Sequence, residues 1–272
     1  MMRLLVVEGN RKETWQAREA CGGVAYHKRF RSMLKLLQPE SEVAVAFPAD
    51  EQSTLPTIDQ LKTFDGVLWT GSSLYVQDQS PAVMRQLAFA DVVFESGVPF
   101  YGSCWGLQIA TVVAGGEVGP NPKGREIGIT LPIELTEAGK KHACFQGRKE
   151  NFNALCVHLD EVVKLPENSV VLAGNEHSAV QALTFRYKKS EFFGVQYHPE
   201  FLVSDMVFII RFLSELLISE GLFQSEELVE AFALKLEDQS RLPECVTNYL
   251  LHAQEIKYWL DGLIKPEMGK TN

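Results

Sequence analysis

The chain has 272 residues, of which 46% are hydrophobic and 22% are charged, and its formal net charge is −9 at pH 7. These values are ordinary for a globular protein with one large domain, or with one domain and an appendage. The acidic balance argues against nucleic acid as the main partner, because affinity for a phosphate backbone depends on Lys and Arg side chains. We therefore expect a small molecule or another protein as the partner.

The sequence shows no sign of a membrane segment or of a disulfide framework. No apolar run approaches the roughly 20 residues that span a bilayer, and the start of the chain is acidic at Glu8, too early for a secretory signal. The five cysteines include no C-x-x-C pair, which favours a reducing compartment. We expect a cytoplasmic protein without a membrane partner, and the sequence indicates neither a cofactor nor a metal site.

The first half of the chain alternates short apolar runs with longer segments of helical periodicity. Strands are expected at residues 4–7, 43–47, 66–70 and 98–101. Continuous hydrophobicity in such runs indicates burial on both faces, as in a parallel sheet between two helix layers. A helix should follow Cys104 and end at Gly115-Gly116. This pattern predicts an α/β fold.

The second half of the chain is expected to be rich in strands. They are predicted at residues 127–135, 155–158, 170–173, 179–185 and 192–197. Ser204 should then cap a helix that continues through Leu216.

The last part of the chain, residues 220–272, is predicted to be a helical extension of a main domain at residues 1–219. Ser225 can cap one amphipathic segment, and a second segment follows Pro243, so a helical hairpin is expected. Its simplest role is packing against the main domain. A lid or a partner surface is the alternative.

Cys104 lies in the run Gly102-Ser103-Cys104-Trp105-Gly106, between an expected strand and an expected helix. Hydrolases display a nucleophile on such a sharp turn, where glycines avoid collisions and the nucleophile adopts a strained backbone conformation. The positive end of the following helix favours a thiolate. Cys104 is therefore the candidate nucleophile, and a small core residue in a packing turn is the alternative.

His198 and Glu200 belong to the run Tyr197-His198-Pro199-Glu200, which follows an expected strand. His198 would hold Cys104 as a thiolate and then protonate the leaving amine, while Glu200 would orient the imidazole. Taken singly, the histidine could be structural and the glutamate a solvated carboxylate. Taken together with Cys104, they predict a triad for acyl transfer through a thioester.

The tetrahedral intermediate of this reaction needs hydrogen-bond donors for its oxyanion. The N–H of Trp105, the residue after the nucleophile, is the first candidate. The N–H of Ser72, exposed by the flexible Gly71 after the strand at residues 66–70, is the second. An ordinary glycine turn is the alternative for this loop.

At these residues the chain resembles the class I (triad-type) glutamine amidotransferases, whose motif is a G-x-C-x-G-x-Q elbow with a later His-Pro-Glu. The matching residues are Gly102, Cys104, Gly106, Gln108, His198, Pro199 and Glu200, and the resemblance covers roughly residues 1–215. The runs at residues 124–128 and 157–166 look like the glutaminase domain of GMP synthase. In that subgroup the loop at residues 71–73 usually reads Gly-Gly-Pro, whereas here it reads Gly71-Ser72-Ser73.

The resemblance implies a flavodoxin-like three-layer sandwich around a central, mostly parallel sheet. It implies hydrolysis of the glutamine side-chain amide, with ammonia passed to a separate synthase, because the sequence contains no Ser-Gly-Gly-x-Asp-Ser pyrophosphatase loop. It also implies that Ser72 and Trp105 stabilise the oxyanion and that Gln108 helps to form the glutamine pocket. His158 resembles the His-x-Asp of the subgroup, and for it a structural role is favoured over a catalytic one.

Two other functions fit the same residues. A γ-glutamyl hydrolase or peptidase would use the same triad but tolerate a larger leaving amine than ammonia. A non-catalytic subunit would instead dock a partner through its C-terminal helices and would be indifferent to Cys104→Ala.

Overall fold

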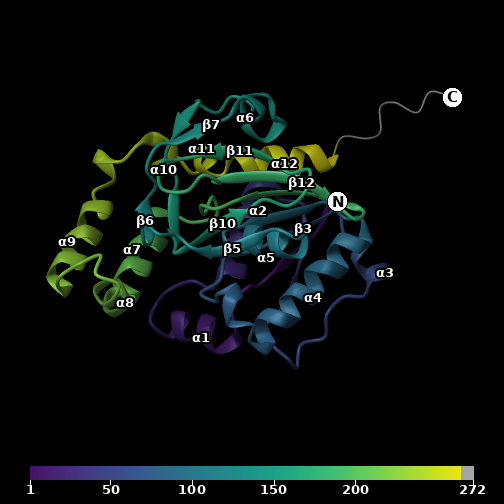
Figure 1. The fold of residues 1–272 in the computed structure, drawn as a ribbon, viewed down its shortest axis with the longest axis horizontal. Helices are drawn as coiled ribbons and strands as arrows, with labels where there is room; N and C mark the ends of the chain where they lie inside the picture. Colours follow the sequence, from purple (N-terminus) through teal and green to yellow (C-terminus); the bar gives the residue numbers. More distant parts are fainter. Residues whose placement is uncertain (265–272) are drawn as a thin grey trace.

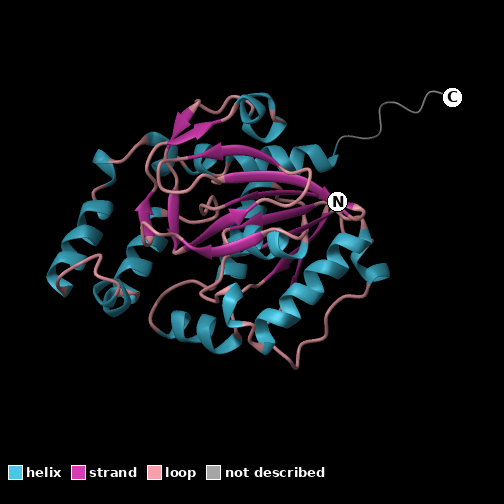
Figure 2. Cartoon of the chain, viewed as in Figure 1, coloured by secondary structure: helices cyan, strands magenta, loops and turns pink. Residues whose placement is uncertain are grey.

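The computed structural model describes residues 1–264, and a large central sheet organises them (Figures 1 and 2). Its strands, in chain order, are β1 (Arg3–Val7), β2 (Glu42–Ala46), β3 (Gly66–Trp69), β4 (Phe100–Ser103), β7 (Ile133–Leu135), β8 (Asn151–Phe152), β11 (Val170–Gly174), β12 (Ala182–Tyr187) and β13 (Ser190–Val195). The spatial order is β2-β1-β3-β4-β13-β12-β11-β7-β8. In this order, the pairs from β2 through β1, β3 and β4 to β13 are parallel. The remaining pairs, from β13 to β8, are antiparallel.

Helices cover both faces of this sheet. One face carries α2 (Tyr26–Leu37) and α12 (Gln254–Ile264), and the other carries α4 (Pro81–Ser96) and α5 (Trp105–Val113). Successive side chains of β1 enter opposite layers, since Leu4 packs with the first pair of helices and Leu5 with the second. This explains the continuous apolar run at residues 4–7 and confirms the predicted three-layer α/β fold.

The remaining helices are short or lie at the ends of the sheet. They are α1 (Lys12–Ala20), α3 (Ile58–Leu61), α6 (Glu137–Lys141), α7 (Val203–Phe212), α8 (Ser214–Ser219), α9 (Glu226–Glu237), α10 (Glu244–Thr247) and α11 (Tyr249–His252), with single 3₁₀ turns η1 (Val76–Asp78), η2 (Ala143–Phe145) and η3 (Gln239–Arg241). Within residues 1–264, none of the helices combines the length and apolar character that crossing a membrane requires.

Two small antiparallel sheets stand beside the large one. Strand β5 (Glu117–Pro120) pairs with β10 (Asp160–Lys164), and β6 (Glu126–Ile129) pairs with β9 (Leu155–His158). The single strand expected at residues 127–135 is therefore wrong, because β6 and β7 belong to different sheets. Between them the N–H of Leu131 donates to Glu126 Oε1 (3.0 Å) and Pro132 has no N–H, so the chain leaves the ladder.

The other expected strands are confirmed, with shifts at their ends, and so is the helix after Cys104. Strand β4 starts at Phe100 and not at residue 98, directly after Pro99, which has no N–H to offer a neighbouring strand. It ends at Ser103, so the turn that carries the candidate nucleophile begins where the strand stops.

The helix predicted from Ser204 to Leu216 differs in two ways. Leu202 occupies the N-cap of α7, where its N–H donates to Asp205 Oδ2 (2.8 Å), and Ser204 lies inside the first turn. Asp205, and not Ser204, makes the capping hydrogen bond, because its carboxylate reaches back from the first turn to the free N–H of Leu202. Helix α7 ends at Phe212, and α8 continues in a separate turn in which Leu217 is fully buried.

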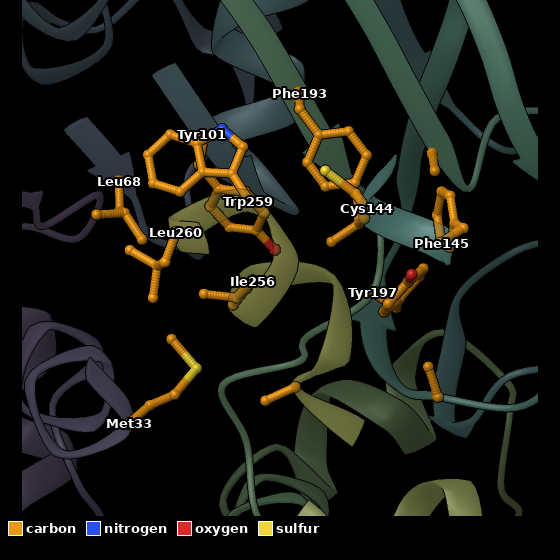
Figure 3. Packing of buried hydrophobic residues seen from close by; sticks show 14 of the residues in the cluster. Met33, Leu68, Tyr101, Cys144, Phe145, Phe193, Tyr197, Ile256, Trp259 and Leu260 are labelled. Carbon is orange, nitrogen blue, oxygen red and sulfur yellow. The ribbon is translucent and has the colours of Figure 1, made fainter. Parts of the chain in front are cut away.

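The helical hairpin expected in the extension is also wrong. Helix α9 packs on α7 and α8, whereas α12 lies beside η2 over the sheet, away from α9 (Figure 1). Val229 and Ala233 of α9 enter one buried cluster, and Ile256 and Leu260 of α12 enter another. Figure 3 shows Ile256 and Leu260 packed within this second cluster. The two apolar faces therefore have different partners, while the domain boundary before residue 220 stays a prediction.

Candidate active site

Cys104 is the single residue between β4 and α5, and its backbone is strained. Its φ of 50° and ψ of −99° lie outside the regions that L-residues favour. A Cβ on Gly102 would lie 2.5 Å from the carbonyl carbon of Gly106, and a Cβ on Gly106 would lie 2.7 Å from the oxygen of Trp69. Both glycines are required for this turn, as the sequence predicted. The fold stabilises a strained turn that presents a thiol at the end of the sheet.

His198 is held in one orientation by Glu200 and Phe201. Its Nδ1 lies 2.7 Å from Glu200 Oε1, and Phe201 stacks on the imidazole with ring centroids 4.1 Å apart. Glu200 is fully buried and also accepts a hydrogen bond from Ser103 Oγ (2.9 Å to Oε2). Ser103 and Phe201 were not predicted, although each adjoins a residue of the predicted triad. Ser103, the residue before Cys104, is thus linked through Glu200 to His198.

The second ring nitrogen of His198 is available for chemistry. Within residues 1–264, the buried Nε2 has no hydrogen-bond partner. Burial lowers the pKa of His198, but the nearby carboxylate of Glu200 and thiol of Cys104 outweigh it and raise that pKa to about 10. The imidazolium is therefore the favoured form at neutral pH, which is the state that pairs with a thiolate and can donate a proton.

The loop that carries Ser72 is tied to the first strand-end loop. Ser72 Oγ donates to the carbonyl oxygen of Gly9 (2.9 Å), and the N–H of Ser73 donates to Asn10 Oδ1 (2.9 Å). Asn10 is held in turn by two hydrogen bonds to Glu8 Oε1, each 3.0 Å long. The N–H of Ser72 itself has no acceptor within residues 1–264. A fixed loop with a free N–H is suited to receive an oxyanion.

Gly71 is needed for a reason other than the one the sequence suggested. Its φ is not positive, so flexibility does not explain it. A Cβ at this position would lie 2.6 Å from Cε1 of His198. The glycine lets the loop approach the imidazole closely.

This contact predicts a strong effect for Gly71→Ala. The added methyl group must displace His198 or the loop, and a misplacement of about 1 Å can lower kcat about 100-fold. Steady-state kinetics together with thermal unfolding would measure it, with Gly262→Ala as the control because no atom lies within 4 Å of a Cβ there. A Gly71→Ala protein with unchanged kcat would contradict the proximity of this loop to the reacting groups.

The N–H of Trp105 and the side chain of Gln108 lie on the first turns of α5. As the first residue of the helix, Trp105 has an N–H without an intrahelical acceptor. Its buried indole points away and donates to Gln86 Oε1 (2.9 Å). Gln108 donates from Nε2 to the carbonyl oxygen of Asp160 (3.0 Å) and lines the cavity beside Cys104.

A cavity of about 260 Å³ opens over Cys104 and His198. Its walls come from the N-terminal helices, the Ser72 loop, the turn between β9 and β10, and the α7–α8 junction. They comprise Thr14, Arg18, Tyr26, Ser72, Ser73, Leu74, Tyr75, Gln108, Arg125, Val157, His158, Leu159, Asp160, Ile209, Phe212, Leu213 and Leu216. Tyr26 and the α7–α8 residues were missed because they come from segments distant in sequence, and no local motif marks them.

Three charged or titratable side chains of this wall differ in how well they are paired. Arg125 is bound by Glu220 (2.7 Å), and His158 contacts Glu126 Oε2 (3.0 Å) and the carbonyl oxygen of Asp160 (3.1 Å), which supports the structural role favoured for it. Asp160 is different, because its buried Oδ2 has no partner in the described part of the chain. Burial raises the pKa of this carboxyl. A cationic group of a ligand would give this oxygen a partner.

Comparison with known families places the chain in a class. The family model for glutamine amidotransferase class-I matches residues 31–212, more than half of the chain. The chain therefore belongs to the class I glutamine amidotransferase family, and the resemblance predicted from its motifs is confirmed.

Among individual proteins, the chain is 33% identical over 282 residues to a γ-glutamyl-L-1-hydroxyisopropylamide hydrolase of a Pseudomonas species, an alignment that covers 97% of this chain and 94% of that one. It is 28% identical to the glutamine-hydrolyzing GMP synthase subunit of Methanocaldococcus jannaschii, over 66% of this chain and 84% of that one. A solved structure of a glutamine amidotransferase from Thermotoga maritima superposes with a TM-score of 0.68 at 17% identity, covering 97% of this chain and 99% of the other. This last likeness concerns the fold alone.

Proposed function

We propose that the chain hydrolyses the side-chain amide of γ-glutamyl compounds, of which glutamine is the smallest, through a thioester on Cys104. The observation that carries the proposal is the buried pair of His198 and Glu200, 2.7 Å apart, beside a strained cysteine at a cavity. The matched family and its hydrolase relatives support the same reaction class.

In the acylation step, the Cys104 thiolate attacks the γ-carbonyl carbon, and the carbonyl electron pair moves to oxygen. The N–H groups of Ser72 and Trp105 stabilise that oxyanion. When the carbonyl reforms, the C–N bond breaks, and His198 gives its Nε2 proton to the leaving amine. The products of this step are the free amine, a γ-glutamyl thioester and a neutral His198.

In the deacylation step, water attacks the thioester carbon and gives a proton to the neutral His198. The C–S bond then breaks, which releases glutamate and restores the thiolate and imidazolium pair. Glu200 keeps the imidazole in one tautomer and orientation through both steps.

The amino acid end of the substrate has a complementary group in the cavity wall. Asp160 offers a buried carboxylate oxygen without a partner in the described part of the chain to the α-ammonium group that glutamine and simple γ-glutamyl amides carry. Gln108, bonded to the backbone of Asp160, forms the same part of the wall.

A second, more specific candidate is an amide whose leaving amine is larger than ammonia. The wall from α7 and α8 presents Phe212, Leu213 and Leu216 to the cavity, and ammonia has no apolar surface for such a wall to bind. The Pseudomonas hydrolase, whose name specifies a hydroxyisopropylamide, matches nearly the whole chain, whereas the M. jannaschii GMP synthase subunit matches 66% of it. If glutamine is the substrate, a separate synthase would receive the ammonia, as the resemblance to that GMP synthase subunit suggests.

The test compares glutamate release from glutamine and from γ-glutamylisopropylamide by the purified chain. We expect Cys104-dependent release from both, with kcat/KM about tenfold higher for the isopropylamide because its alkyl group is buried. Leu216→Asn should remove that advantage and leave glutamine hydrolysis nearly unchanged. Leu234→Asn, at an exposed leucine on α9, is the matched control. Glutamine as the only substrate would exclude the larger amine, and no release from either would overturn the proposal.

A further inference from the structure

The C-terminal helices contact the segment that carries His198 and Glu200 at three points. Tyr249 Oη donates to the carbonyl oxygen of Glu200 (3.1 Å), and His252 Nε2 lies 2.9 Å from the carbonyl oxygen of His198. One residue earlier, Tyr197 Oη donates to Glu255 Oε1 (2.8 Å). Residues 249–255 therefore hold the backbone or side chain of three of the four residues from Tyr197 to Glu200.

That segment depends on such contacts because it lacks regular secondary structure. Strand β13 ends at Val195, and His198 lies beyond it at the start of a turn. The N–H of His198 donates to the carbonyl oxygen of Leu155 (2.8 Å). The carbonyl oxygen of His198 accepts from the N–H of Phe201 (3.2 Å), and His252 supplies a second donor to it from a fully buried ring. Burial lowers the pKa of His252 to about 4, so this ring is neutral at pH 7 and donates from Nε2–H.

Glu255 is itself held in place by a buried ion pair with Arg148. Its Oε1 lies 3.2 Å from Arg148, and the two side chains are 0% and 3% exposed. Arg148 also donates to the carbonyl oxygen of Leu251 and lies over the ring of Phe152. A buried ion pair seldom stabilises a fold more than apolar residues of the same volume would. Stability alone therefore does not explain why this pair adjoins Tyr197, whose neighbour is His198.

We propose that Tyr249, His252 and Glu255 act as a C-terminal clamp that positions His198 against Cys104. They are positioning residues, because none of the three is among the residues that line the cavity over Cys104. The inference rests on the proposed function in so far as His198 is the acid and base of the reaction. It assigns to residues 249–255 a role in turnover beyond packing.

Figure 3 shows the packing of α12, the helix that contains Glu255 and follows the other two clamp residues. Ile256, Trp259 and Leu260 of α12 pack among Leu68, Tyr101 and Phe193 of the central sheet, and Tyr197 belongs to the same cluster. The clamp residues precede or begin α12, so they are attached to a helix that is buried against the central sheet.

The test uses two rates, one of which does not require turnover. The rate at which iodoacetamide alkylates Cys104 at pH 7, followed by mass spectrometry of its peptide, reports whether His198 supports a thiolate there. Tyr249→Phe removes a single hydroxyl from a half-buried ring, and we expect about a fivefold fall in both this rate and kcat, with KM unchanged. His252→Leu should cause a larger fall, and His252→Gln, which keeps an N–H donor, should recover part of it.

The controls separate failure of the clamp from failure of the proposed function. Tyr258→Phe, a partly buried tyrosine of α12 outside the clamp, should leave both rates unchanged. His198→Asn should slow alkylation of Cys104 strongly; if it does not, the proposed function fails. If His198→Asn slows alkylation but Tyr249→Phe and His252→Leu, both folded, leave alkylation and kcat unchanged, the clamp is overturned.

Discussion

Cys104→Ala is expected to abolish the hydrolysis of γ-glutamyl amides while leaving the protein folded. Without the sulfur no thioester can form, and the loss should be at least about 10⁴-fold in kcat, because the remaining groups cannot replace a covalent nucleophile. Alanine retains the Cβ that the strained turn already accommodates at a φ of 50°. Glutamate release and thermal unfolding, measured on the same preparations, would check this result.

Cys21→Ala is the matched control, because Cys21 is exposed and lies outside the cavity. It should keep wild-type activity. If a folded Cys104→Ala protein still supported the function of the chain in cells, the chain would be a partner-binding protein and not an enzyme.

Glu200→Gln is expected to slow turnover by about 10²–10³-fold, less than Cys104→Ala. The carboxylate orients His198 and accepts Ser103 Oγ, but it does not form the thioester. A neutral amide of the same shape preserves the volume and removes the charge. Steady-state kinetics on both γ-glutamyl substrates would measure the loss, and Glu191→Gln, an exposed glutamate on β13, is the control.

The same variant should change the pH dependence of kcat/KM. The charge of Glu200 helps to raise the pKa of His198 to about 10, against the opposing effect of burial. The protonated imidazole is therefore present below about pH 10 and is lost above it. In Glu200→Gln the carboxylate no longer raises the pKa of His198, while burial still lowers it. The alkaline limb should therefore move to lower pH. An unshifted alkaline limb, or a loss as complete as in Cys104→Ala, would contradict the assigned role.

The features that the sequence predicted well are those encoded over a few neighbouring residues. The strained turn at Cys104 needs Gly102 and Gly106, which stand two positions away on either side, and the structure shows both contacts. The parallel strands were recognisable because burial on two faces requires an unbroken apolar run. The pairing of His198 with Glu200 is likewise local, since Pro199 alone separates them.

The features that the sequence did not predict depend on which distant segments meet. Ser103 contacts Glu200 across 97 positions, and Tyr249 contacts the same residue from the C-terminal side. The apolar pattern of the two segments after Ser225 and Pro243 correctly predicts helices, although the second segment is divided into α10, α11 and α12. The pattern does not say which surface each helix covers. Helices α9 and α12 therefore resemble a hairpin in the sequence, although they pack into different clusters.

Different γ-glutamyl amides are expected to pass through one thioester on Cys104. Hydroxylamine added during turnover would intercept that thioester and yield γ-glutamyl hydroxamate in competition with glutamate. A common acyl-enzyme requires the same hydroxamate-to-glutamate ratio from glutamine and from γ-glutamylisopropylamide at a given hydroxylamine concentration. A ratio that changes with the leaving amine, or hydroxamate formed equally by Cys104→Ala, would contradict the thioester.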